Sequence, residues 1–310
     1  MKHGKYRFVL TFLALPVGLY AWLVILPFAQ AFQISMTDWT GNTNSFNYIG
    51  FDNFVDMFTD WYIGPAVLAG LKHTGIILVV MPVVTIVLSL FFAFMLNVGG
   101  ASRGGRIRGV RGSAFYKVVY FFPQLLSLAI VAILWRKIYG PPAAGGMITT
   151  VLDFFGIDTP SGGFLAEKSL VLACVISVMV WSAVGFYLVF FSSAMAAIPQ
   201  DIYEAAAIDG ASRVKTFFKI TLPLLWESIQ TAWVYLGIIA LDGFVLVYLM
   251  TPEQGGPDHA SEVIGGVIYK VSFTQAERGM GAAIGVVLFF ATLTIAVMSM
   301  RISRREQIEM

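Results

Sequence analysis

The sequence predicts an all-α, polytopic membrane protein with six transmembrane helices in a single domain, residues 1–310. The chain is 58% hydrophobic and only 12% charged, whereas a soluble domain carries about 25% charged residues. Six apolar runs each approach the ~20 residues that a helix needs to cross the hydrocarbon core. Because that core offers no water, backbone groups must pair within each segment, which favours helices.

The predicted spans are separated by polar loops. The stretch Ala29-Gln30-Ala31, near the end of the first run, resembles a signal-peptidase site. That run is longer than the roughly 7–15 residues of a signal-peptide core, so its length favours a retained helix over a cleaved signal. Pro82 predicts a kink in the second span, and Pro123 lies early in the third. In chain order the predicted spans are 8–32, 74–97, 118–138, 169–196, 226–250 and 279–300.

The distribution of Lys and Arg predicts the side on which each loop lies. Fourteen of the 20 lie in the N-terminal segment, the 98–117 loop, the 198–225 loop and the C-terminal tail, against six elsewhere. Because Lys and Arg concentrate on the cytoplasmic side, both termini and these two loops are predicted to be cytoplasmic. On the opposite side, the apolar stretch 262–273 is too short to span; it predicts a short surface helix, with a re-entrant element as the alternative.

The polar segment Pro199–Leu225 has an order of its own. Asp201 and Glu204 have the spacing of a capping box at the start of a short helix, and Gly210 suits the left-handed position that ends such a helix. A second helix is predicted to begin at Ser212 and to present three apolar side chains on one face: Val214, Phe217 and Phe218. A helix–glycine–helix element with a small or apolar face predicts docking to another protein, and an ordinary amphipathic loop is the alternative.

Three groups of residues in this segment carry a resemblance: Glu204-Ala205-Ala206, Asp209-Gly210-Ala211 and Ile220-Thr221-Leu222-Pro223. Their sequence and spacing resemble the EAA loop of permease subunits in binding-protein-dependent ABC importers, so we call Pro199–Leu225 the EAA segment. The resemblance implies the ABC importer type I permease fold and a cytoplasmic loop that seats in a cleft of an ATPase subunit. The residues that it implicates in ATPase coupling are Glu204, Ala205, Ala206, Asp209, Gly210, Phe217, Lys219 and Pro223.

Two further stretches resemble carbohydrate permeases. Trp181–Phe186 resembles a segment of their subunits that begins with tryptophan and ends with an aromatic residue. Phe244–Thr251, followed by Gly255-Gly256-Pro257, resembles a stretch typical of the maltose and glycerol-phosphate permeases. The sequence departs from that pattern by inserting Pro252-Glu253-Gln254, and by Glu227 near a position where many members have proline. The resemblance implies a subunit of a carbohydrate importer.

Apart from Glu227 at the very start of the fifth span, Asp242 is the only acid inside a predicted span. A charged group at the membrane centre costs about 2.5–3.5 kcal/mol on insertion scales, so Asp242 requires a partner or a watery cavity. One interpretation is a helix–helix hydrogen bond; the other, favoured by the resemblance, is a cavity acid that binds sugar hydroxyls. Aromatic rings nearby could stack on a pyranose or simply pack. The candidate residues of the substrate pathway are Trp181, Phe186, Tyr187, Asp242, Gly243 and Tyr248.

Several function classes are disfavoured by what the sequence lacks. It contains no GxxxxGK[ST] motif, so the chain is not expected to bind ATP itself or to be an enzyme. The glycine- and arginine-rich loop 98–117 is better explained by its membrane side than by nucleic-acid binding. With Cys174 as the single cysteine and three scattered histidines, no metal site and no cofactor are expected.

The resemblance therefore implies one half of an ATP-driven import pathway for a mono- or oligosaccharide. The implied partners are a second homologous permease in a heterodimer, two ATP-binding subunits, an extracellular or periplasmic solute-binding protein, membrane lipid and the sugar. One alternative is an ABC permease for another solute, such as a glycerol-phosphate compound. The other is an ion-coupled secondary transporter, for which several ionisable groups at mid-membrane would be expected.

Overall fold

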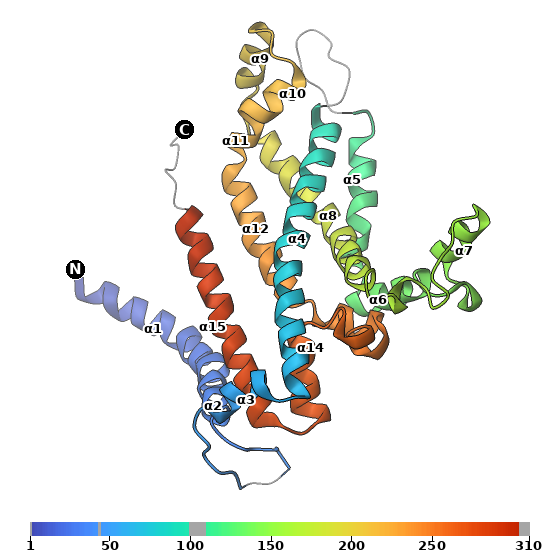
Figure 1. The fold of residues 1–310 in the computed structure, drawn as a ribbon. Helices are drawn as coiled ribbons and strands as arrows, with labels where there is room; N and C mark the ends of the chain where they lie inside the picture. The colour runs from blue at the N-terminus through green and yellow to red at the C-terminus, as the bar shows by residue number, and fades with distance from the viewer. Residues whose placement is uncertain (1, 43–44, 99–109, 304–310) are drawn as a thin grey trace. The chain divides into compact units, whose positions relative to one another are not determined.

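The computed structural model describes residues 2–42, 45–98 and 110–303 of the protein (Figure 1). Within these ranges the chain is helical and forms no β-strand, apart from one isolated antiparallel bridge between Thr37 and Tyr48. Two compact units can be separated, and each is described by itself. The first comprises residues 1–68 and 267–295, and the second residues 69–266 and 296–310.

The first unit contains the N-terminal and C-terminal membrane helices. The N-terminal helix is continuous over α1 (Lys2–Tyr20), the π-helical η1 (Ala21–Ile25) and α2 (Leu26–Ile34), and it contains the predicted first span. Rings of Phe28 and Phe289 lie 4.1 Å apart and pack α2 against the last helix. The other elements of this unit are α3 (Asp52–Thr59), η8 (Lys270–Thr274) and α15 (Arg278–Ser303).

The second unit is built around two long helices, α4 (Ile63–Val98), which begins in the first unit, and α8 (Val171–Ala196). The connections of this unit contain four short 3₁₀ turns: η3 (Pro142–Ala144), η4 (Phe164–Ala166), η6 (Pro252–Gln254) and η7 (Pro257–His259). Its other helices are α5 (Ser113–Phe121), η2 (Phe122–Leu125), α6 (Leu128–Ile138), α7 (Met147–Phe154), α9 (Gln200–Ile208), α10 (Arg213–Thr216), η5 (Phe217–Thr221), α11 (Leu222–Leu224), α12 (Trp226–Leu241), α13 (Phe244–Met250) and α14 (Ile264–Tyr269), the last of which ends in the first unit.

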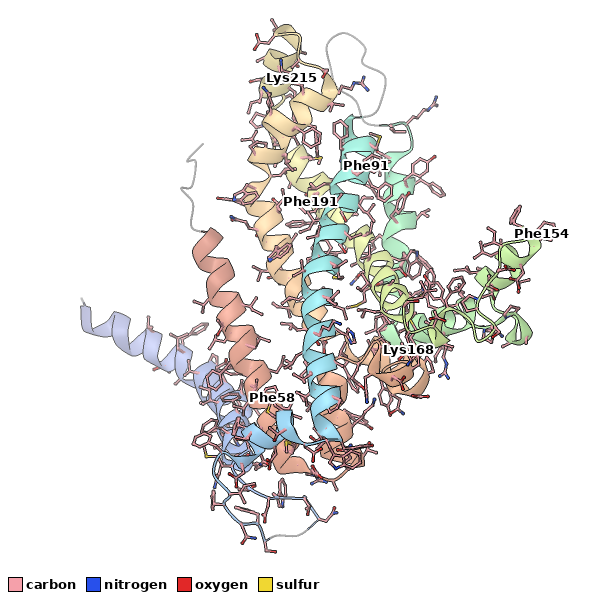
Figure 2. The ribbon with its side chains drawn as sticks, in the orientation of Figure 1. Phe58, Phe91, Phe154, Lys168, Phe191 and Lys215 are labelled. Atoms are coloured by element: carbon pink, nitrogen blue, oxygen red, sulfur yellow. The ribbon has the colours of Figure 1, made fainter. Side chains whose placement is uncertain are left out.

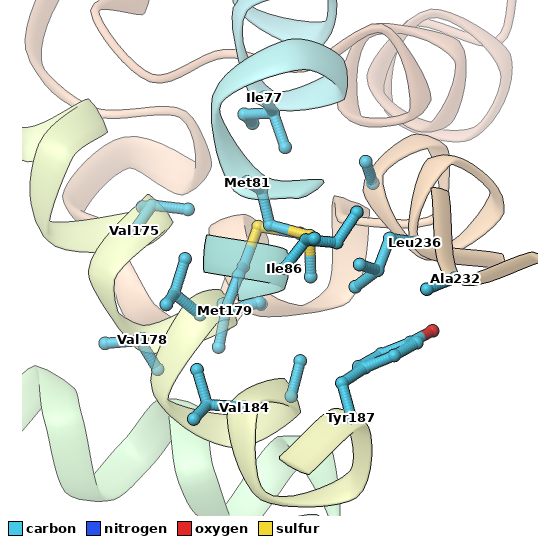
Figure 3. Close-up of a cluster of buried hydrophobic side chains, with 14 of the residues drawn as sticks. Ile77, Met81, Ile86, Val175, Val178, Met179, Val184, Tyr187, Ala232 and Leu236 are labelled. Atoms are coloured by element: carbon cyan, nitrogen blue, oxygen red, sulfur yellow. The ribbon is translucent and has the colours of Figure 1, made fainter. Parts of the chain in front are cut away.

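The core of the second unit lies where α4, α8 and α12 meet (Figure 3). Ile77, Met81 and Leu236 have no exposed surface there. At the other side of α8, Gly185 lies against α5, where a Cβ would overlap the main-chain carbonyl of Tyr120. Small residues let membrane helices approach closely, so Gly185 fixes the distance between α5 and α8.

Two of the predicted spans are not single straight helices. The third, expected over 118–138, consists of Ser113–Leu125 and Leu128–Ile138, which are bent by 97°. Pro123 contributes no amide proton, and Leu126 and Ser127 have extended backbones with ψ of 142° and 136°, which ends one helix and starts the next. The fifth is interrupted at Asp242, between α12 and α13. A further bend of 68° separates Arg213–Leu224 from Trp226–Leu241.

Four helices in the described part of the chain are long and apolar enough to cross a membrane, and six spans result if each bent pair counts as one. The all-α, polytopic fold class is therefore confirmed. The stretch 262–273, expected to contain a short helix, forms α14 and continues into the π-helical η8.

Candidate functional site

The EAA segment folds as two short helices joined by a glycine turn. Helix α9 ends before Gly210, which adopts the left-handed conformation (φ +71°) as predicted. Ser212 then caps α10, because its Oγ accepts a hydrogen bond of 3.3 Å from the backbone N–H of Lys215. Both of these local features were readable from residue type and spacing.

The start of α9 differs from the capping box that the sequence predicts. The helix already begins at Gln200, so Asp201 lies in its first turn and no side chain caps it; Pro199 occupies the N-cap position. Asp201 still favours the helix, because a carboxylate in the first turn complements the positive end of the macrodipole. Glu204 is left on the surface.

Six of the eight predicted coupling residues are exposed: Glu204, Ala205, Asp209, Gly210, Lys219 and Pro223. Ala206 is buried, and Phe217 turns inward, with its ring 4.7 Å from that of Phe94. Val214 and Phe218 remain exposed, so the face that the sequence assigned jointly to Val214, Phe217 and Phe218 is split. The π-helical turn η5 begins at Phe217 and changes the phase of the side chains after it.

Ile208 is an exposed apolar residue of the EAA segment that the sequence analysis did not single out. Its side chain is 86% exposed at the C-terminal end of α9, next to the glycine turn. Val214 and Phe218 of the same segment are exposed as well, at 59% and 61%. The signal in the sequence was an apolar residue directly before Asp209-Gly210, where a helix end was already expected.

Within the second unit, α9 and α10 lie at the same end as the C-terminus of α4 and the start of α5 (Figures 1 and 2, the latter labelling Lys215 in α10). The predicted basic loop 98–117 joins those two helix ends. Arg103, Arg106 and Arg108 of this loop lie outside the described residues. Lys117 donates a hydrogen bond of 3.1 Å to Oδ1 of Asn97. The EAA segment and the described residues on either side of the basic loop thus lie at one end of this unit.

A cavity of about 230 Å³ lies in the second unit beside Asp242, and we call it the Asp242 cavity. Three parts of the unit form its walls: the break between η2 and α6, the middle of α8, and the break between α12 and α13. The lining residues are Pro123, Gln124, Leu126, Leu128, Val131, Met179, Ser182, Ala183, Ile239, Asp242, Gly243 and Leu246.

The breaks in both interrupted helices line this cavity. Irregular backbone at membrane depth is tolerated where it is buried in protein or lines a water-filled cavity. In transporters, discontinuous helices form the substrate site in this way. Leu126 lies at the first break and Asp242 and Gly243 at the second. The Asp242 cavity therefore lies where the breaks of two helices meet.

The Asp242 carboxylate is exposed and, among the described residues, makes neither a hydrogen bond nor an ion pair. The helix–helix hydrogen bond considered from the sequence is not present. Gly243 permits the close approach of α8, because a Cβ there would lie 3.2 Å from Cε of Met179. Both residues line the Asp242 cavity, which makes its acid accessible to a solute.

The aromatic candidates lie outside the lining of this cavity. Trp181 packs edge-on against Trp135, with ring centroids 5.2 Å apart, and Phe186 lies 6.4 Å from Phe121. Tyr187 is 3% exposed and belongs to the core shown in Figure 3. Tyr248 packs on Phe244, with centroids 5.3 Å apart.

Gln124 and Ser182 are the polar lining residues that sequence reasoning missed. Gln124 follows Pro123 inside an otherwise apolar run, and this isolated amide was the available signal. The Ser182 hydroxyl donates to the carbonyl of Met179 at 2.9 Å and can accept a further hydrogen bond. Among the described residues, no group of three or more His, Cys, Asp or Glu side chains is placed to hold a metal ion.

Comparison with solved structures identifies the fold. The fold matches a bacterial ABC transporter involved in the import of the polysaccharide alginate, with a TM-score of 0.77 and 23% identity over 98% of each chain. The MetNI methionine ABC transporter matches with a TM-score of 0.52 and 16% identity, over 77% of this chain and 95% of that one. At these identities the similarity establishes the fold, which is that of a type I ABC importer permease.

The family follows from the sequence comparisons. The chain belongs to the family "Binding-protein-dependent transport system inner membrane component", whose model matches residues 5–305. It is 40% identical to the diacetylchitobiose uptake permease NgcF of Streptomyces coelicolor, over 98% of this chain and 84% of that protein. It is 28% identical to the multiple sugar-binding transport permease MsmF of Streptococcus mutans, over 96% of both chains. The resemblance seen in the sequence is thereby confirmed, and the protein is a multi-pass inner-membrane component.

Proposed function

We propose that this chain is the transmembrane subunit of an ATP-driven sugar importer and forms half of its translocation pathway through the Asp242 cavity. The observation that carries the proposal is the meeting of two helix breaks at a small cavity whose acid, Asp242, has no partner among the described residues. Solute moves through this cavity when the helices rearrange, and Asp242 accepts hydrogen bonds from sugar hydroxyls. The ATP is hydrolysed by partner subunits, because the chain has no P-loop of its own.

The EAA segment is the proposed contact with the ATPase subunits. Its exposed surface combines Ile208 with Val214 and Phe218, and basic side chains lie at its margin. The distribution of Lys and Arg supports a cytoplasmic position for this segment and for both termini. A second homologous permease and an external solute-binding protein complete the proposed assembly.

A short β-linked amino-sugar oligosaccharide is the proposed substrate class, because the diacetylchitobiose uptake permease NgcF is 40% identical to this chain. The sn-glycerol-3-phosphate permease UgpA of Escherichia coli is 31% identical over 83% of this chain and offers an alternative. The cavity lining disfavours a phosphate ester: its one ionisable side chain is Asp242, and no Lys, Arg or His accompanies it. An anion would be repelled there.

Uptake by the reconstituted transporter tests the proposal. Proteoliposomes that contain this chain, the second permease and the ATPase subunits receive the binding protein, ATP and labelled solute. We expect ATP-dependent uptake of N,N′-diacetylchitobiose that unlabelled glycerol 3-phosphate does not inhibit. Uptake that proceeds without ATP, or uptake of glycerol 3-phosphate alone, would contradict the proposal.

A further inference from the structure

The first unit contains a larger cavity of about 660 Å³, next to the exposed residue Trp61, and we call it the Trp61 cavity. It lies between the loop after α2, helix α3 and the starts of α4 and α15, all within the first unit. Its volume is within the roughly 300–1,000 Å³ of small-molecule sites. None of its lining residues lines the Asp242 cavity, so the two cavities are separate sites.

Hydrogen bonds of the main chain fix the walls of this cavity. Asn53 is 6% exposed, and its Nδ2 donates to the carbonyls of Ser35 and Thr37, both at 2.9 Å. The N–H of Gly279, at the start of α15, donates to the carbonyl of Trp39 at 2.9 Å. A Cβ at Gly279 would overlap the Thr37 carbonyl, so glycine is required for this contact. The cavity is therefore formed by the fold before any ligand enters.

The cavity presents an aromatic surface. Trp61 lies in the short connection between α3 and α4, and it is 85% exposed. A tryptophan face beside polar groups suits a sugar ring, and it also attracts a cation through the quadrupole of the ring. The ring of Trp39 already has a cationic partner, because the guanidinium of Arg278 lies 5.4 Å from its centroid.

The charge of the lining is negative. It contains Asp38, Asp56, Asp60 and Glu277, and it contains no Lys, Arg or His. Two of these acids have structural roles: Asp38 accepts hydrogen bonds of 2.6 and 2.9 Å from Asn47, and Oδ1 of Asp60 accepts from two N–H groups that begin α4.

The other two acids are available to a ligand. The carboxylates of Asp56 and Glu277 make neither a hydrogen bond nor an ion pair with the described residues. Burial, and then the negative charge of Asp60, raise the pKa of Glu277. A cation beside Glu277 would relieve its repulsion with Asp60.

We propose that the Trp61 cavity binds an amino sugar of one or two rings, with its protonated amine between Asp56 and Glu277 and its ring against Trp61. The cavity is large enough for a whole sugar. A single basic side chain from another protein would leave most of this volume unfilled. A bare metal ion is disfavoured, because the described acids do not form a metal-binding group. The inference does not depend on which solute passes through the Asp242 cavity.

Calorimetric titration of the purified transporter complex, without its binding protein, tests this assignment. The probes are D-glucosamine and N-acetyl-D-glucosamine, which share a ring and differ in charge at the nitrogen. We expect saturable binding of D-glucosamine and at least about tenfold weaker binding of the neutral acetylated sugar. Glu277→Gln, Asp56→Asn and Trp61→Ala should each weaken D-glucosamine binding by about tenfold, a loss within the range of one charged or aromatic contact.

Asp52→Asn is the matched control, because Asp52 is an exposed acid on the same helix α3 and does not line the cavity. This variant should bind D-glucosamine as the unaltered complex does. Absence of saturable binding, or equal affinity for the two sugars, would overturn the proposal. So would loss of binding in Asp242→Asn, which would assign the signal to the other cavity. If Glu277→Gln lowers the affinity of the complex for the solute-binding protein but leaves D-glucosamine binding unchanged, the Trp61 cavity is a protein-docking site and the proposal is wrong.

Discussion

The EAA segment and the Asp242 cavity lie in the same unit but are constructed differently. The EAA segment consists of consecutive residues whose short helices, glycine turn and serine cap are determined locally. The Asp242 cavity combines residues from three distant parts of the chain, and two of these are interruptions in helices. One region leaves apolar side chains exposed on its surface, and the other encloses a mostly apolar cavity with three polar lining residues, Gln124, Ser182 and Asp242.

This difference indicates where each region is vulnerable. An exposed docking surface tolerates substitution in the isolated subunit and fails only when the partner must bind. A cavity formed by helix breaks depends on close backbone contacts, so a substitution there affects the fold and transport together. Four substitutions test this distinction.

Replacing Gly185 by leucine should have the largest effect. Its Cβ would overlap the Tyr120 carbonyl, so α5 would have to separate from α8, and overpacking of this kind costs about 1–3 kcal/mol or more. We expect a strong loss of monodisperse complex and of thermal stability in detergent. Gly237→Ala is the control, since the nearest atom to its Cβ is the Leu78 methyl at an ordinary 3.6 Å. Equal stability of the two variants would show that the α5–α8 contact does not hold the cavity together.

Ile208→Glu should separate assembly from folding. The side chain is 86% exposed, so the variant should insert and fold normally. If Ile208 anchors the ATPase, the charge should weaken co-purification of that subunit by at least about tenfold, as expected for an interface hot spot. Ile157→Glu supplies the same substitution at an apolar residue, 53% exposed, outside the EAA segment. Unchanged co-purification of Ile208→Glu would remove this residue from the coupling surface.

Gln124→Leu should alter transport without altering assembly. The leucine preserves much of the volume but removes the amide that could bind a sugar hydroxyl at the cavity wall. We expect the concentration for half-maximal uptake to rise by about tenfold, because one lost polar contact is worth about 0.5–1.5 kcal/mol or somewhat more. Thr231→Val is the control, since its hydroxyl bonds within α12 to the Glu227 carbonyl. An unchanged uptake curve would limit Gln124 to a structural role.

The smallest effect is expected at the ion pair between Lys168 and Asp258, in loops outside the spans. Hydrogen bonding to Lys168 lowers the pKa of Asp258, so its stabilising contribution is present above the ordinary carboxyl pKa and is lost as pH falls through the lowered value. Because both side chains are solvated, Asp258→Asn should hardly change the melting temperature at pH 7. If Asp258→Asn lowered the melting temperature strongly at pH 7 but not in acid, the ion pair would be stronger than we infer.

The amino-acid sequence predicted the local features better than the assembled ones. Composition and apolar runs led to the all-α membrane fold, and Gly210 and Ser212 led to the turn and cap of the EAA segment. Phe217 and Phe218 are consecutive in the chain, so their side chains point about 100° apart around a helix, and the sequence does not say which of the two turns inward. Gln124 joins Asp242 only through a 97° bend between helices, which no residue spacing encodes.

The Trp61 cavity shows the same limit. Glu277 is far in the sequence from Asp38, Asp56 and Asp60, and only the fold brings the start of α15 beside α3 and the start of α4. Trp181 and Tyr187 illustrate the reverse case. Their aromatic character fitted a sugar site, but the fold packs the first against Trp135 and buries the second.

Cysteine labelling tests the central claim that the Asp242 cavity is the solute pathway. Cys174 is the only cysteine in the sequence, so Cys174→Ser provides a background for Ser182→Cys in the lining and for Ser193→Cys on the exposed surface of α8. The measurement is the rate at which a charged thiol reagent blocks ATP-dependent uptake. We predict that the reagent inhibits Ser182→Cys, that transported sugar with binding protein slows this reaction, and that Ser193→Cys is unaffected. Rapid inhibition of Ser182→Cys that the sugar does not slow would contradict the account.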